Sequence, residues 1–365
     1  MSNPHFRDGP RARLYEAELS PAIAAARFGL DPATIDDFSL NVNPCGPPAS
    51  AVVAARAALD RCNAYPDTRL PALRKALARR HGVDDDRLLF GAGLDDVIKL
   101  VVHAWTVEAG RLLVHLPTFP RYELEARLRG CEVVAVRSNP PWTIDIAAIR
   151  SALAEQSAAV AFLCTPNNPT GATIATEDIA ALARRFRDTI FVVDEALGDP
   201  RNAGATALAR TEPNVVVLRT FSKAFGLAGL RIGYAIGPAA LLALVERGRP
   251  PFNVAMPAEA AAVAVLDDDA FLAQSYETFR AEASRFAAAL ETMPRLALRG
   301  RHANMLLIED LSGNAATCVD ALAAQGVLVA DAACFGGFEG RSAIRVSLGD
   351  PTANTRLLDA MKHLP

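Results

Sequence analysis

The feature that most constrains the fold is an alternation of short apolar runs with segments of helical spacing between residues 88 and 247. The run from Ala158 to Cys164 has no polar alternation, which is typical of a strand covered on both faces. The pattern therefore predicts a largely parallel sheet with helices on both sides. The strand candidates are 88–90, 112–116, 132–136, 159–164, 190–194, 214–219 and 232–236, and the helical stretches are 94–106, 121–129, 145–155, 175–187 and 238–247.

The pattern changes after Pro250-Pro251. An interrupted helical region at about 257–293 precedes strand candidates at 303–309, 327–330 and 343–347 and helices at 315–325 and 352–363. The segment from about Tyr15 to Gly29 also has helical spacing. We predict an α/β protein with a large domain at 46–250 built on a mostly parallel seven-stranded sheet, a small α+β domain at 251–365, and an N-terminal segment, 1–45, that packs with the small domain.

Composition narrows the class of protein. Hydrophobic residues make up 51% of the chain, charged residues 22%, and the net charge is −3, which argues against nucleic acid or an anionic membrane as a partner. Residues 1–15 lack the apolar centre of a signal peptide, and no apolar run is long enough to span a bilayer. The six cysteines and six histidines show neither disulfide nor metal-ligand spacing. We therefore expect a cytoplasmic protein with reduced, buried cysteines and no metal site.

The stretch from Thr220 to Tyr234 carries the strongest chemical signal. It combines Thr220, Ser222 and Lys223 with a glycine-rich turn and Arg231. A lysine whose pKa is lowered by burial and nearby cations is a nucleophile toward an aldehyde cofactor. The hydroxyl groups and the arginine suit a phosphate. A solvated loop lysine would explain the Ser222–Lys223 pair alone, but not the whole stretch.

Other polar or aromatic residues lie at the ends of strand candidates, where open α/β sheets bind ligands. Asp194 follows four apolar residues, so it either caps the next segment or pairs with a protonated ring nitrogen. Asn168 either only shapes a turn or donates its amide to a phenolate oxygen. Phe119 is either a core residue or stacks on a flat ring. The helix start at Leu94-Asp95 suits one phosphate group.

Together these residues resemble fold-type I pyridoxal-phosphate (PLP) enzymes and, more closely, the histidinol-phosphate aminotransferases of the class I/II aminotransferases. The resemblance rests on Tyr65-Pro66-Asp67, Asn167–Gly171, Asp194-Glu195-Ala196 and Thr220–Arg231, within matching motifs from about residue 36 to 349. It implies an aspartate aminotransferase-like fold, pyridoxal 5′-phosphate as the cofactor, and a homodimer whose subunits share their active sites.

The resemblance also implies individual roles. Lys223 would form the imine with the cofactor and later move a proton, and Asp194 would pair with the ring nitrogen. Arg345, Asn168 and Asn43 would bind the substrate, Arg345 through its α-carboxylate or an equivalent group. At the cofactor ring, Asn168 would contact the 3-oxygen and Phe119 would stack on the ring face. The cofactor phosphate would be held by Thr220, Ser222, Arg231, the backbone of Leu94 and Asp95, and the neighbouring subunit's Tyr65.

The branch of the family stays open. The stretches 24–30 and 37–44 resemble the threonine-phosphate decarboxylases of cobalamin synthesis, whereas the lysine region resembles the aminotransferases. Three positions of this chain depart from these families. The decarboxylases and the aminotransferases both usually have an arginine near the position of Ala330. The decarboxylases also have a His-Gly-Gly run where this chain has residues 18–21, and the aminotransferases often have a tyrosine in place of Leu197. These departures argue against a phosphorylated substrate, unless Arg121 or Arg341 substitutes or the match slips around 335–338.

We therefore predict an aminotransferase that acts on a small amino acid or amino alcohol. A threonine-phosphate-type decarboxylase is the alternative, because the same residues serve when the Cα–carboxylate bond stands perpendicular to the ring. A non-enzymatic PLP-binding regulator is the third hypothesis. It lacks support, since no DNA-binding extension precedes the domain and the catalytic set is complete.

Overall fold

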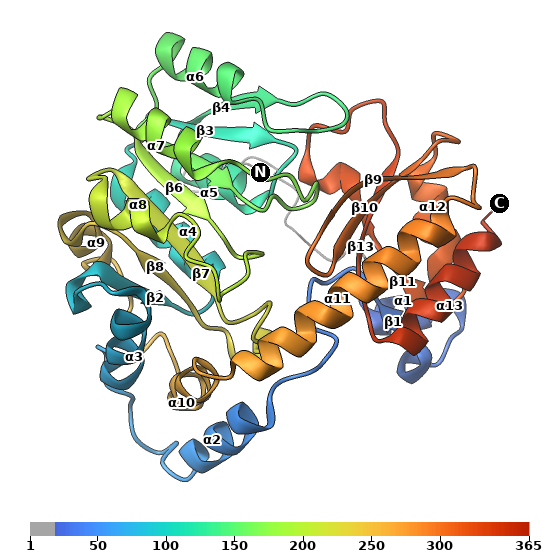
Figure 1. Ribbon diagram of the computed structural model, residues 1–365, viewed down its shortest axis with the longest axis horizontal. Helices are drawn as coiled ribbons and strands as arrows, with labels where there is room; N and C mark the ends of the chain where they lie inside the picture. Colours follow the sequence, from blue (N-terminus) through green and yellow to red (C-terminus); the bar gives the residue numbers. More distant parts are fainter. Residues whose placement is uncertain (1–18, 365) are drawn as a thin grey trace, which may run out of the picture.

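A large, mostly parallel sheet dominates the computed structural model, which describes residues 19–364 (Figure 1). Its seven strands follow the order β2-β8-β7-β6-β5-β3-β4. Strand β8 is antiparallel to β2 and β7, and the other pairs are parallel. The predicted sheet is therefore confirmed. The strands are β2 (Leu88–Gly91), β3 (Arg111–Leu116), β4 (Glu132–Arg137), β5 (Val160–Cys164), β6 (Ile190–Asp194), β7 (Val215–Thr220) and β8 (Gly233–Ile236).

Alternate residues of the central strands face two separate apolar cores, as the pleat of a strand requires. In β6, Phe191 and Val193 pack on one side of the sheet and Val192 packs on the other. Helices on both sides complete the cores, so the parallel strands are buried on both faces. The first face is covered by α2 (Ala49–Leu59), α3 (Pro71–His81), α6 (Ile146–Glu155), α7 (Thr176–Arg185), α8 (Thr206–Thr211) and α10 (Met256–Val265), and the second by α4 (Leu94–Trp105), α5 (Arg121–Arg129) and α9 (Ala239–Glu246).

A smaller antiparallel sheet of four strands, in the order β12-β13-β10-β9, lies beside the large one (Figure 1). Helix α11 runs from one sheet to the other, because Leu272 belongs to the core of the large sheet and Phe286 to the core of the small one. The elements here are α11 (Asp269–Leu290), β9 (Leu296–His302), β10 (Met305–Asp310), α12 (Ala315–Ala323), β11 (Val327–Leu328), β12 (Ala330–Asp331), β13 (Ala343–Ser347) and α13 (Pro351–Lys362).

The N-terminal segment packs against the small sheet's helices. Strand β1 (Asp36–Asp37) pairs in parallel with β11, and Ala24 of α1 (Pro21–Phe28) packs on Ala323 and Leu328. Residues 39–42 then lead from this unit toward the large sheet. Four short 3₁₀ turns complete the described elements: η1 (Pro32–Thr34), η2 (Asp85–Arg87), η3 (Ala228–Leu230) and η4 (Ala332–Phe335).

The structure differs from the sequence-based prediction in several places. Strand β9 was not predicted, and α8 had no predicted counterpart. Helix α10 packs in the core of the large sheet, so the change of packing partner falls within α11, later than residue 250. The first residues of the helix expected from Tyr15 lie outside the described part. All six cysteines are free, but Cys45 and Cys62 are exposed rather than buried.

Candidate active site

A cavity of about 390 Å³ lies at the carboxyl ends of the parallel strands, between the large sheet, residues 40–42 and the small sheet. It brings together ten of the residues singled out from the sequence: Leu94, Asp95, Phe119, Asn168, Asp194, Thr220, Ser222, Lys223, Arg231 and Arg345. Asn43 and Tyr65 do not line it. Residues distant in the chain therefore converge on one site, as expected for the C-terminal edge of a doubly wound sheet.

Lys223 follows β7 and reaches the cavity wall from the large sheet. Its Nζ donates a hydrogen bond of 2.8 Å to the carbonyl oxygen of Asn41. Burial, followed by the nearby positive charge of Arg345, lowers the pKa of the Lys223 amine to about 8. Roughly a tenth of the amine is therefore neutral at pH 7, far more than for an ordinary lysine, as a nucleophile or general base requires.

Asp194 ends β6 and is held by two donors. The hydroxyl of Tyr122 donates to Oδ2 at 2.6 Å, and the backbone N–H of Ala196 donates to Oδ1 at 2.8 Å. Burial raises the pKa of Asp194 to about 6, although the hydrogen bond from Tyr122 acts in the opposite direction. Tyr122 is itself fixed by stacking on Phe162, with ring centroids 4.4 Å apart. The site thus presents a buried carboxylate that forms no ion pair with any lysine, arginine or histidine among residues 19–364.

Arg231 and the N-terminus of α4 form another wall of the cavity. The guanidinium lies 3.6 Å from Oδ2 of Asp95 and donates to the carbonyl of Ala228 at 2.9 Å. A Cβ atom on Gly93 would overlap this guanidinium, so the close approach requires glycine. Arg231 has φ of 51°, a left-handed backbone that is uncommon outside glycine and often occurs at ligand clamps. The first N–H groups of α4 have no acceptor within the helix, which makes this wall suited to an anion.

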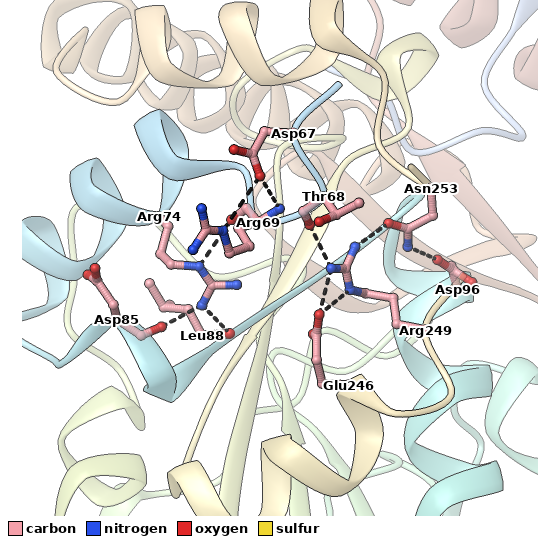
Figure 2. Close-up of polar contacts among 10 residues, drawn as sticks. All are labelled: Asp67, Thr68, Arg69, Arg74, Asp85, Leu88, Asp96, Glu246, Arg249 and Asn253. Atoms are coloured by element: carbon pink, nitrogen blue, oxygen red, sulfur yellow. Dashed lines mark hydrogen bonds and ion pairs between the residues drawn. The ribbon is translucent and has the colours of Figure 1, made fainter. Parts of the chain in front are cut away.

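A second layer of polar contacts braces this wall (Figure 2). Asp96 accepts from the backbone N–H of Ala92 at 2.9 Å and from the side chain of Asn253 at 2.8 Å. Arg249 donates to the Asn253 side chain at 2.7 Å and to the carbonyl of Thr68 at 2.6 Å. The network therefore ties the turn before α4 to the segment that carries Tyr65.

Asn168 and Phe119 complete the part of the cavity nearest β5 and β3. The Oδ1 atom of Asn168 is buried and has no hydrogen-bond partner. Its neighbour Asn167 makes hydrogen bonds with Thr118, Thr170 and the carbonyl of Pro117, so the turn holds its shape without help from Asn168. Phe119 lies edge-on to Tyr122, with centroids 5.7 Å apart. Asn168 is therefore a group whose polar partner has to come from a ligand.

Asn43, which the resemblance places at the substrate, lies outside the cavity lining, and its amide makes hydrogen bonds within the fold. Nδ2 donates to the carbonyl of Ala224 at 2.8 Å and to Ser275 at 2.9 Å, while Oδ1 accepts from the N–H of Cys45 at 2.9 Å. Asn41, two residues earlier, lines the cavity instead. The sequence offers both asparagines as turn formers, and only the tertiary packing separates their roles.

Arg345 lies on β13 and is fully buried. It donates to the carbonyl of Ser39, and its guanidinium carbon lies 5.5 Å from the ring centroid of Phe335. Ala330 pairs directly with Arg345 across the β12–β13 ladder, so the alanine stands beside the arginine where the resemblance leads one to expect a second cation.

Neither suggested substitute reaches the cavity. Arg121 pairs with the buried Glu125, and Arg341 donates to Glu309 at 2.9 Å. Among the residues that line the cavity in the described chain, the cations are therefore Lys223, Arg231 and Arg345.

Tyr65 is 81% exposed and stacks on Phe252, with ring centroids 4.5 Å apart. It is therefore directed at solvent in the single chain. The sequence-based reasoning missed Tyr122 and Asn41. The spacing of Phe119 and Tyr122 places both near the start of α5, which is the one signal that could have pointed to Tyr122.

Comparisons with known proteins agree with this geometry. A model of the family described as aminotransferase class I and II matches residues 34–361. A histidinol-phosphate aminotransferase from Roseiflexus castenholzii is 36% identical over 348 residues, covering 93% of this chain and 92% of that protein.

Two solved structures have similar folds. Histidinol-phosphate aminotransferase from Sinorhizobium meliloti, solved in complex with pyridoxal-5′-phosphate, has a TM-score of 0.87 at 22% identity and covers 100% of this chain and 99% of that one. L-threonine-O-3-phosphate decarboxylase from Porphyromonas gingivalis has a TM-score of 0.79 at 25% identity and covers 90% and 98%. In the part of the chain that the structure describes, no helix combines the length and apolar content needed to cross a membrane.

Proposed function

Because the chain belongs to the class I and II aminotransferases, we propose that it is a pyridoxal-phosphate-dependent aminotransferase acting on a small amino acid or amino alcohol. The observation that carries the proposal is the presence, in one cavity, of a half-buried lysine with a lowered pKa and a buried carboxylate with a raised pKa. Groups whose environments move their pKa values in this way occur most often at active sites.

The residues present fit the cofactor. Within the described chain, Asn168 has a buried oxygen without a hydrogen-bond partner, and the buried Asp194 carboxylate forms no salt bridge. The Gly93–Arg231 contact leaves a cradle in which a phosphate would meet a helix N-terminus and a guanidinium. Phe119, Thr220 and Ser222 would add a ring face and two hydroxyl groups, and the backbone of Leu94 and Asp95 would add N–H donors.

When bound, pyridoxal phosphate supplies the electron sink that makes the bonds at the substrate Cα atom labile. Lys223 would hold the cofactor covalently through Nζ and later carry a proton at the same atom, for which a pKa of about 8 is well matched. Asp194 would keep the ring nitrogen protonated, and Tyr122 and Ala196 would keep Asp194 in place. Arg345 would orient the substrate through an anionic group.

A phosphorylated substrate is disfavoured by the charges of the cavity. If Arg231 serves the cofactor phosphate, Arg345 is the arginine that remains among the described cavity residues, and Ala330 stands where a second cation could be. A phosphate dianion buried with one arginine would be poorly compensated, whereas a carboxylate would be matched.

Decarboxylation is the second candidate. The structural similarity to L-threonine-O-3-phosphate decarboxylase supports it, and the same lysine and aspartate would serve both reactions. The orientation of the substrate bonds at Cα decides between the two outcomes, and Arg345 is the group that would set it.

One experiment separates the candidates. The holoprotein is mixed with candidate amino acids while its absorbance is recorded and released carbon dioxide is measured. Conversion to a pyridoxamine spectrum would support transamination, and carbon dioxide release without this conversion would support decarboxylation. Neither result with any amine would contradict both enzyme proposals and leave the PLP-binding regulator. The Lys223→Ala variant should form no borohydride-reducible adduct, and an adduct at the same site would refute the assignment of Lys223.

We also propose that the protein is a homodimer in which Tyr65 contacts the phosphate in the neighbouring subunit's site. The exposed Tyr65–Phe252 pair supports this proposal, since large aromatic residues at a surface are typical of interfaces. Lys223→Ala and Tyr65→Ala, each inactive alone, should regain activity when they are mixed and reassociated, because one site of the mixed dimer is then intact. No recovery despite subunit exchange would count against a shared site.

A further inference from the structure

We propose that the side-chain amide of Asn41 is a substrate-binding group. Together with Arg345 it would hold the carboxylate of an α-amino acid whose own side chain is apolar. The inference rests on the proposed aminotransferase function and narrows its substrate class to amino acids. An amino alcohol has no carboxylate for this pair to bind, and a phosphate ester carries a larger negative charge.

The amide of Asn41 is buried without a partner. The residue is 4% exposed and lines the cavity, and neither Oδ1 nor Nδ2 has a hydrogen-bond partner. Buried polar side chains in native proteins are almost always hydrogen-bonded, so an amide with both ends unsatisfied in a cavity indicates that a ligand completes it. Asn43 provides the contrast, because its amide is fully used within the fold.

The segment around Asn41 is held in place from several directions. The backbone N–H and hydroxyl of Ser39 donate to Oδ1 of Asp37, at 2.8 and 2.6 Å. Asn304 donates to the carbonyl of Val42. The unsatisfied amide is therefore carried by fixed backbone and is preorganised for a ligand rather than left over from a mobile loop.

The same segment accepts hydrogen bonds from two side chains of the cavity. The carbonyl of Ser39 accepts from Arg345, and the carbonyl of Asn41 accepts from Lys223 Nζ at 2.8 Å. Asn41 lines the same cavity as Arg345, so its Nδ2 donor is suited to an anionic oxygen that the guanidinium would also attract. Its Oδ1 is an acceptor and suits an amine, and an α-amino acid presents a carboxylate and an amine on one carbon.

The residues beside Asn41 indicate the character of the substrate's side chain. Leu40 and Val42 are each 40% exposed and line the cavity, as does Leu197. These three apolar side chains offer no hydrogen bond to a phosphate or a second carboxylate. They favour an aliphatic or aromatic amino acid, which would cover apolar surface that is otherwise open to water.

The test measures binding and turnover separately in the holoprotein. Isocaproate, which is leucine without its amine, serves as an unreactive carboxylate probe in titration calorimetry. In Asn41→Ala its Kd should rise about ten-fold, the effect of losing one hydrogen bond to a charged group. Asn41→Asp keeps the size of the side chain but opposes the carboxylate, so its Kd should rise further. Asn202→Ala makes the same truncation at an exposed site and should bind as the wild type does.

Turnover adds a second readout. For L-leucine, KM should rise by a similar factor in Asn41→Ala while kcat changes far less, and the KM of L-leucinol, which has no carboxylate, should change little. An unchanged Kd for isocaproate in both Asn41 variants would overturn the inference. Tighter binding of histidinol phosphate than of L-leucine by the wild type would overturn it as well. If no amine is converted but isocaproate binding still depends on Asn41, the proposed reaction fails and the carboxylate site stands.

Discussion

Replacing Asp194 with asparagine should remove activity and yet stabilise the cofactor-free protein at neutral pH. The carboxyl is buried at the end of β6, and its pKa is about 6 in the folded protein in place of 3.8. A pKa raised by this amount means that folding with the ionised form costs about 3 kcal/mol. The amide of asparagine has the same shape, carries no charge, and can still accept from Ala196 and donate to Tyr122.

The sign of the pH dependence follows from the direction of the shift. Because the folded pKa of Asp194 lies above its unfolded value, the cost is complete above about pH 6 and disappears as the pH falls from 6 toward 3.8. The stabilisation by Asp194→Asn should therefore be about 3 kcal/mol at pH 8, roughly 1.5 kcal/mol at pH 5 and roughly 0.5 kcal/mol at pH 4. Most buried carboxylates that are paired with a cation show the opposite trend.

Urea unfolding of the apoprotein at these pH values measures the effect through the midpoint and slope for wild type and variant. Asp188→Asn, an exposed aspartate in the loop before β6, is the matched control and should leave stability nearly unchanged at every pH. An Asp194→Asn variant that is no more stable than the wild type at pH 8, or whose gain in free energy of unfolding does not grow with pH, would refute the assigned cost of ionised Asp194.

Two further variants probe the surroundings of this carboxylate. Tyr122→Phe removes the 2.6 Å hydrogen bond that favours ionised Asp194, so the pKa of Asp194 should rise by about one unit or more in the apoprotein. In urea unfolding, the cost of ionised Asp194 should then reach its full value at a correspondingly higher pH than in the wild type. An unmoved pH dependence would show that the hydroxyl has no such role. Arg219→Ala leaves the buried Glu195 without its 2.6 Å ion-pair partner, and should lower the free energy of unfolding by about 3–5 kcal/mol in denaturant titration. The exposed pair Arg111–Glu132 provides the control, since Arg111→Ala should change the free energy of unfolding by less than about 1 kcal/mol.

The sequence predicts the large sheet well because its strands are buried on both faces. A strand such as β5, which is buried along its whole length, leaves a continuous apolar run that can be recognised without tertiary information. Strand β9 lies at the edge of the small sheet and is half-buried, with Arg299 and Arg301 on its open side. Its pattern resembles a polar continuation of the preceding helix, so it was missed.

The convergence of Lys223, Asp194 and Asn168 on one cavity was predictable for a related reason. These residues occur in short motifs at strand ends, and the parallel topology alone brings strand ends together. Which asparagine lines the cavity depends on long-range packing. Ala224 and Ser275, which lie far along the chain, occupy the amide of Asn43 and leave Asn41 in the cavity wall. Nothing in the sequence near either asparagine indicates these contacts.

Lys223 and Asp194, the two ionisable groups at the centre of the cavity, both lower the stability of the cofactor-free protein in the same pH range. Lys223 has a pKa of about 8 in place of 10.5, so the cost of its charged form is complete below pH 8 and fades as the pH rises toward 10.5. The cost of ionised Asp194 is complete above pH 6. Between pH 6 and 8 both costs are present, together at most about 6 kcal/mol, which is comparable to the whole stability of many domains. A cation beside Asp194 would remove the cost of its ionised form, and loss of the charge on Lys223 would remove the cost of the buried ammonium. These are the two changes that binding pyridoxal phosphate would bring, so folding and cofactor binding are expected to be strongly linked.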